Sequence, residues 1–170
     1  MGAEAMQDGI YETAEDEMWI KADWFKLHLR PGNVTNETPP LPLNKTATEV
    51  LGDFLKYLFE CASSYIQDTH ANGPDLWASV EKDIDYVFSH PNGWEGIQQT
   101  QMRQAAVQAG LIPDTTEGHA RISFVTEGEA SLHFSIQNGL LSEAMKVGGY
   151  VDVYWIEYDA DVLFVSKGMV

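Results

Sequence analysis

Acidic, serine and histidine side chains gather just after a β-prone run late in the chain. Residues 126–129 read Thr-Glu-Gly-Glu, and Ser131 and His133 follow them. A serine and a histidine beside acids could form a nucleophilic triad, but the Gly-x-Ser-x-Gly turn of such enzymes is absent from the sequence. Glu129 is best explained as an acid in a first helical turn, where the helix dipole stabilises it. Glu127 could have the same role, or could face a ligand at the end of a strand.

The remaining reactive side chains predict neither a protein-held metal nor an active thiol. The five histidines lack the spacing of metal ligands, and no cysteine cluster accompanies them: His28, His70, His90, His119 and His133. Cys61 lies in an apolar run, so we expect it to be a small buried hydrophobe. We expect Arg103 to form a surface ion pair. Trp94, which follows a glycine in a turn, is expected to be a packing anchor.

Composition indicates one acidic globular domain. The chain has 170 residues, 44% of them hydrophobic, and its net charge of −16 comes from 10 basic and 26 acidic residues. This charge should repel nucleic acids and anionic membranes, and no apolar run reaches the roughly 18 residues of a membrane span. The N-terminus has no secretory pattern, and a lone cysteine suits a reducing compartment. We therefore expect a cytoplasmic protein.

The first part of the chain predicts two helices separated by a loop. Apolar spacing favours a helix over residues 18–29, ended by Pro31-Gly32, and proline-rich residues 31–42 read as a loop. The stronger helix begins with Thr46 as N-cap and Glu49 three positions later, which is the spacing of a capping box. One apolar stripe then continues to about Gln67 and is expected to face the core.

The second part alternates strands and helices. The pattern predicts, in order, a strand at 83–88, a turn at 89–93, a helix at 95–109 capped by Gly110, a loop at 111–118, a strand at 120–125 and a helix at 129–141. This βαβα order is typical of a parallel sheet with flanking helices, so we expect an α/β fold. Ligands of such sheets lie at the carboxyl ends of the strands, here residues 89–94 and 126–129. Residues 150–165 are strand-like.

Two stretches carry a family resemblance. His90-Pro91-Asn92-Gly93-Trp94 precedes a helix ending in Ala109-Gly110, and residues 122–132 read Ile-Ser-Phe-Val-Thr-Glu-Gly-Glu-Ala-Ser-Leu. Together with residues 24–29, they resemble the divergent eukaryotic branch of the seventy-kilodalton heat-shock proteins, the fungal members in particular. The resemblance covers most of residues 20–145 and leaves 147–170 as a divergent tail. It implies that residues 1–170 form a partial actin-like (ribonuclease H-like) ATPase domain with a parallel-sheet βαβα core and an added helical subdomain.

The resemblance also implies roles for three residues. Glu127 matches the family's acidic residue that faces the Mg²⁺-phosphate site and positions water, which makes it the candidate catalytic residue. Lys26 could match the lysine near the γ-phosphate, although a solvated helix lysine is the alternative. Gly128 replaces the usual proline of the Glu-Pro turn. Lys26, Glu127 and Gly128 are therefore the candidate cofactor-binding residues, with ATP and Mg²⁺ as the implied cofactors.

The chain departs from the family at the phosphate loops. Relatives hold ATP with D-x-G-T-T and D-x-G-G-G-T, whose glycines let backbone N–H groups surround phosphate oxygens. Neither pattern occurs in this sequence, and Gly148-Gly149 precedes a strand-like run instead of ending one. We therefore expect a truncated or degenerate heat-shock-type ATPase domain that binds nucleotide but does not hydrolyse ATP alone. The alternative is a non-catalytic acidic module that binds a protein partner.

Overall fold

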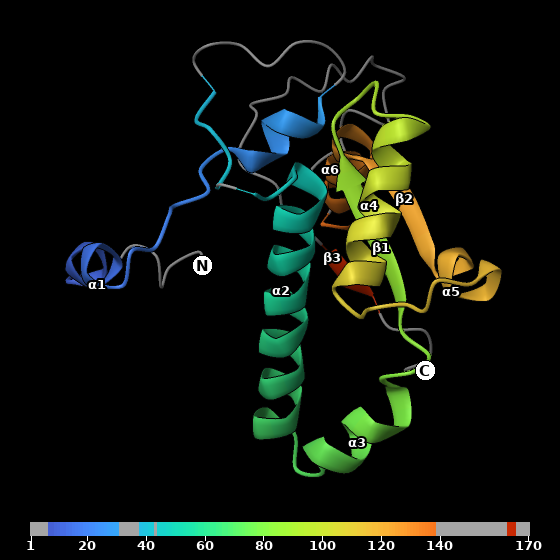
Figure 1. Ribbon diagram of the computed structural model, residues 1–170. Helices are drawn as coiled ribbons and strands as arrows, with labels where there is room; N and C mark the ends of the chain where they lie inside the picture. The colour runs from blue at the N-terminus through green and yellow to red at the C-terminus, as the bar shows by residue number, and fades with distance from the viewer. Residues whose placement is uncertain (1–6, 31–37, 43, 139–162, 166–170) are drawn as a thin grey trace.

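The computed structural model describes residues 7–30, 38–42, 44–138 and 163–165 of the chain. In chain order its elements are α1 (Ile10–Asp16), the 3-10 helix η2 (Phe25–Leu29), α2 (Ala47–Thr69), α3 (Gly73–Val80), β1 (Asp85–His90), α4 (Ile97–Gln108), α5 (Thr116–Ala120), β2 (Ile122–Thr126), α6 (Glu127–Gln137) and β3 (Leu163–Val165). The expected α/β class is confirmed in its coarse form. Helices dominate, and α2 and α4 stand beside a small sheet (Figure 1).

The sheet contains a parallel pair and one antiparallel strand. Its order is β2-β1-β3, and β1 runs parallel to β2 with His90 opposite Thr126. The two predicted strands therefore pair as the βαβ pattern requires. β3 lies antiparallel to β1, with Asp85 opposite Val165, so the sheet adds an antiparallel strand beside the expected parallel pair. A short apolar run can pair in either direction, so its sequence does not determine the direction. The other residues of the strand-like region 150–165 lie outside the described residues.

The core is centred on β1. Its alternate residues Tyr86 and Phe88 have no exposed surface, and Ala105 and Ala106 of α4 are equally buried. Alternation along the strand directs these side chains to one face of the sheet, where α4 covers them. α2 then packs against α4 at Gly52, where an added Cβ would lie only 3.3 Å from the carbonyl oxygen of Ala105. Small residues at this crossing let the two helices approach closely enough to seal the core.

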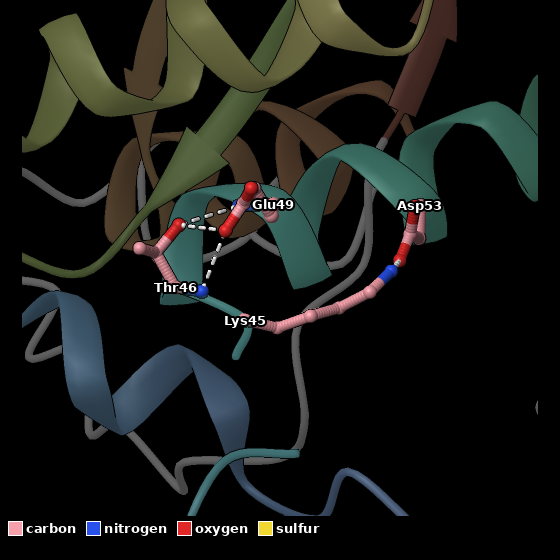
Figure 2. A network of polar contacts seen from close by, with 4 residues as sticks. All are labelled: Lys45, Thr46, Glu49 and Asp53. Atoms are coloured by element: carbon pink, nitrogen blue, oxygen red, sulfur yellow. Dashed lines mark hydrogen bonds and ion pairs between the residues drawn. The ribbon is translucent and has the colours of Figure 1, made fainter. Parts of the chain in front are cut away.

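Helix α2 begins with the predicted capping box (Figure 2). The Thr46 hydroxyl oxygen accepts a hydrogen bond from the Glu49 N–H at 3.3 Å, and the Glu49 carboxylate accepts one from the Thr46 N–H at 2.7 Å. Both bonds satisfy backbone donors that a helix start leaves without intrahelical partners. The bonds from Thr46 lower the pKa of Glu49. The sequence therefore located this helix start correctly.

Two aromatic contacts join α2 to its neighbours. Phe54 meets Phe25 of η2 at 5.8 Å between ring centroids, and Phe59 meets Trp77 of α3 at 5.3 Å. The apolar stripe of α2 is thus core-facing, as predicted. Helix α3, with Pro74 in its first turn, was not among the predicted elements. Its length of 8 residues gives little periodicity to detect, and its burial comes from Trp77.

The predicted helix over residues 18–29 is wrong. Met18 and Trp24 have φ angles of 54° and 52°, in the left-handed region, which interrupts any α-helix there. Only the short 3-10 helix η2 remains, held by Leu29, which is 2% exposed. Ile10–Asp16, for which the sequence predicted no element, form α1. The apolar spacing that favoured this helix includes Trp24, but the Trp24 side chain is 57% exposed and does not face the core.

Three smaller expectations also change. Cys61 is exposed, not buried, because six residues separate it from Leu55 and rotate it by about 240° around α2, away from the core. α5 occupies part of the expected loop at 111–118. α6 ends at Gln137, and the rest of the helix predicted to 141 lies outside the described residues apart from Asn138, its C-cap. The cap at Gly110, with φ at 77°, agrees with its predicted place after α4.

Replacing Thr46 with alanine should destabilise the protein by about 1 kcal/mol, because the start of α2 loses its side-chain acceptor. Thr69→Ala is the matched control, since that hydroxyl only donates to the Tyr65 carbonyl in the last turn of the same helix. Urea unfolding at neutral pH measures both. The contribution of Glu49, whose pKa is lowered, should be present above about pH 4.5 and be lost as the pH falls below it. Equal losses in the two variants would contradict the capping role.

Tyr86 should make stability fall in alkaline solution. Burial raises the pKa of Tyr86 from 10.0 to about 12, although the Arg121 guanidinium, 5.9 Å from the ring, opposes the shift. Between these pH values the folded protein keeps a proton that the unfolded chain has released, so unfolding becomes easier as pH rises. The loss should reach about 2 kcal/mol at pH 11.5. Denaturant unfolding of wild type and Tyr86→Phe from pH 9 to 11.5 measures it, and parallel curves would contradict the assignment.

Candidate functional site

Two of the sequence-predicted site residues meet in the fold. The Lys26 ammonium donates a hydrogen bond to the Glu127 carboxylate and forms an ion pair with it, although 101 positions separate them in the chain. Their side chains are 24% and 19% exposed, so the pair is largely withdrawn from water. The pair lies where β2 ends and α6 begins, at the carboxyl end of the parallel strands. This is the edge where the sequence placed a ligand site.

Thr126 fixes the acidic member of the pair. It ends β2, and its hydroxyl oxygen accepts a 3.2 Å hydrogen bond from the Glu129 N–H, so it is the N-cap of α6. Glu127 is therefore the first residue of α6, and Gly128 is the second. Because the first turn of a helix carries partial positive charge, it stabilises the carboxylates of Glu127 and Glu129. Gly128, the third candidate residue, contributes a peptide N–H to this turn.

The 3-10 helix η2 positions the basic member. Leu29 is buried, and Phe25 packs on Phe54 of α2, so both ends of η2 are anchored to the core. The Leu27 N–H donates to the Trp24 carbonyl at 2.9 Å and closes the turn. Lys26 is thereby held on the side that faces α6. Lys26 is therefore paired and largely buried, and is not the solvated lysine of the alternative.

Trp94 forms a wall of the same site. It is 4% exposed, which confirms the predicted packing anchor, and the Lys26 ammonium lies 5.9 Å from the centroid of its ring. This cation–π distance adds to the attraction of the ion pair. Sequence reasoning missed the contact with Lys26. The available signal was the position of Trp94 in the loop that follows β1, at the carboxyl edge of the sheet.

His90 occupies the end of β1 and is 4% exposed. Its Nδ1 lies 2.8 Å from the Pro91 carbonyl oxygen, and its Nε2 lies 3.2 Å from the Gln99 side-chain nitrogen. Because a carbonyl only accepts, Nδ1 carries the hydrogen and Nε2 accepts from the Gln99 amide. Both ring nitrogens are therefore occupied by the protein. His90 joins the loop after β1 to α4 and supports the site without facing it as a free base.

The other candidates do not join this site. Arg103 is not in the expected surface ion pair, because its guanidinium lies over the ring of Phe124, 4.6 Å from the centroid. Ser131 and His133 are two residues apart on α6, a spacing that directs them to different sides of a helix. His133 lies 4.0 Å from the exposed carboxylate of Glu129, one turn earlier. The rejected triad therefore has no geometry to support it.

Over the described ranges, no three His, Cys, Asp or Glu side chains gather to hold a metal ion. An open depression of about 480 Å³ lies at the corner between α2 and α3, lined by His70, Ala71, Asn72, Asp75, Leu76 and Ser79. This corner lies at the C-terminal end of α2, whereas η2, the element that carries Lys26, lies at the other end of that helix (Figure 1). Within the part of the chain that the structure describes, every helix is too short or too polar to cross a bilayer.

Comparisons with known proteins add no further assignment. The chain matches no protein-family model, no curated protein and no solved structure at a significant level.

The Lys26–Glu127 pair should contribute about 1 kcal/mol of coupling energy to folding, since partial burial strengthens it beyond an exposed pair. We expect urea unfolding of Lys26→Met, Glu127→Gln and the double variant to give a smaller loss for the double than for the sum of the singles. The control is the exposed pair Lys45–Asp53, with Lys45→Met and Asp53→Asn. Its coupling should be under about 0.5 kcal/mol. Equal coupling in the two cycles would contradict the special position of the Lys26–Glu127 pair.

Proposed function

We propose that the chain is a degenerate lobe of a heat-shock-type, actin-like ATPase domain that binds the phosphate end of a nucleotide and does not hydrolyse ATP alone. The supporting observation is the convergence of Lys26 and Glu127, the two residues that the family resemblance assigns to the phosphate site. They come from elements 101 positions apart and meet at the carboxyl end of the parallel strands.

The residues present fit one phosphate group. Lys26 offers up to three N–H donors to phosphate oxygens, and Glu127 can accept a hydrogen bond from a water beside that phosphate. Bound Mg²⁺ would supply positive charge against the phosphate oxygens. Gly128, in the first turn of α6, adds a backbone N–H near the same position. Trp94 encloses one side and limits the access of water to Lys26.

Charge makes this binding conditional. Lys26 is already paired with Glu127, and Glu127 and Glu129 occupy the helix start that would otherwise attract an anion. A free phosphate must therefore compete with a carboxylate in a chain of net charge −16. A phosphate accompanied by Mg²⁺ carries less negative charge. We thus expect affinity for the magnesium nucleotide and little affinity for the free anion.

Hydrolysis requires more than this pair supplies. Phosphoryl transfer depends on fixing the whole polyphosphate and stabilising the charge that develops on it. Neither of the two Gly-rich phosphate patterns of the family occurs in this sequence, so these residues do not supply the backbone cradle of the β- and γ-phosphates. The carboxylate that would orient water is also held by Lys26. The chain therefore acts by binding.

Mg²⁺-ATP and Mg²⁺-ADP should raise the melting temperature of the full chain by a few degrees at saturating concentration, because only the native state binds them. A thermal-shift titration measures this, with ATP plus EDTA and sulfate as ligand controls. Lys26→Met should abolish the shift. Lys21→Met is the matched control, since Lys21 is exposed and pairs locally with Asp23 at 3.2 Å.

Glu127→Gln gives the complementary result. It frees Lys26 from its carboxylate partner, so inorganic phosphate or ATP without Mg²⁺ should now produce a shift that wild type lacks. A cooperative melt with no nucleotide-specific shift in wild type would refute the proposal. So would equal shifts in wild type and Lys26→Met.

A further inference from the structure

The N-terminal segment, residues 7–24, exposes apolar side chains that the core does not use. Among the described residues, nine large hydrophobic side chains are exposed, and five of them lie in this segment. They are Tyr11 at 60%, Met18 at 86%, Trp19 at 55%, Ile20 at 59% and Trp24 at 57% exposed. Single exposed hydrophobics are ordinary, but such a concentration marks an interaction surface.

The segment is nevertheless locally ordered. The Met18 N–H donates to the Glu15 carbonyl at 3.3 Å, and the Trp19 N–H donates to the Ala14 carbonyl at 2.7 Å. This pair of bonds is the Schellman ending of a helix, with Met18 in the left-handed position usually taken by glycine. The backbone at Trp19 is therefore turned back toward α1, while its side chain stays exposed. The left-handed backbone at Met18 is strained for a residue with a side chain, and it fixes the chain direction beside the exposed Trp19.

Helix α1 stands apart from the helices around the sheet (Figure 1). It contains no buried residue, and an extended stretch connects it to η2. Its side chains thus add little to the core formed by α2, α4 and β1. Folding therefore leaves the apolar side chains of this segment uncovered, where a partner can pack on them.

The charge of the segment defines what can cover it. Residues 7–24 contain six carboxylates and one lysine: Asp8, Glu12, Glu15, Asp16, Glu17 and Asp23 against Lys21. Lys21 is itself paired with Asp23. Anionic lipids, nucleic acids and acidic proteins would be repelled by this surface. A basic partner gains electrostatic attraction, and apolar groups between its charges can cover the aromatic side chains.

We propose that residues 7–24 form a docking surface for a basic amphipathic helix of a protein partner. Lysines and arginines of that helix pair with the interspersed carboxylates, while its apolar face packs on Trp19, Ile20 and Tyr11. Flexible Met18 adapts to the shape of the partner. This mode combines helix docking through an apolar face with charge selection. The inference is independent of nucleotide binding, which involves Lys26 and Glu127.

The test uses the full chain and a fluorescein-labelled helical peptide with leucine on one face and lysine on the other. Fluorescence anisotropy gives its Kd for wild type and for the triple variant Tyr11→Ser, Trp19→Ser, Ile20→Ser. The matched control is Tyr65→Ser, Ile97→Ser, Phe134→Ser, which removes three equally exposed hydrophobics elsewhere. All six positions are exposed, so both triples should keep the wild-type melting temperature.

We expect the N-terminal triple to bind at least about 10-fold more weakly than wild type, and the control triple to change by less than about 2-fold. A peptide with serine in place of leucine should bind about 10-fold more weakly to wild type, and one with glutamate in place of lysine should not bind. Equal losses in the two triples, unchanged binding of the N-terminal triple, or no binding of the leucine–lysine peptide to wild type would each overturn the proposal.

Discussion

Burial of β1 beneath α4, with α2 packed against α4, is the interaction on which the rest of this structure depends. Tyr86 and Phe88 are removed completely from water, and two alanines of α4 lie over them with the same burial. Those small residues, with Gly52 of α2, set how closely the layers approach. Parallel pairing of β1 with β2 then places both strand ends at one edge. The candidate site exists because this edge is fixed by a core that excludes water.

At that edge the fold brings opposite charges together. Lys26 lies in η2, which has few hydrogen bonds of its own. Aromatic packing anchors η2 to α2. Glu127 is the first residue of α6, where the helix dipole favours a carboxylate. Each element is weak alone, and the ion pair beside Trp94 links them. In the proposed function, the same pair also determines which anion Lys26 can accept, because a bound phosphate must compete with the Glu127 carboxylate.

Acidity acts differently in the two regions proposed to bind ligands. Near Lys26, negative charge opposes a phosphate and favours one accompanied by a cation. In residues 7–24, negative charge surrounds exposed aromatic side chains and favours a basic partner. One composition, 26 acidic against 10 basic residues, thus underlies both the proposed condition on nucleotide binding and the proposed choice of a basic partner. The physical basis in each case is the free energy of bringing another charge to an acidic surface.

The sequence by itself determined the local structure: the Thr46–Glu49 cap, the apolar stripe of α2, and the two strands with the helix between them. These features arise within a few residues along the chain, where capping and periodicity act. Only the tertiary structure decided that Cys61 faces solvent, that Arg103 lies on Phe124, and that β3 pairs antiparallel. It also decided that Lys26 and Glu127 form an ion pair across 101 positions. Such contacts depend on how whole elements pack, and no local pattern specifies that packing.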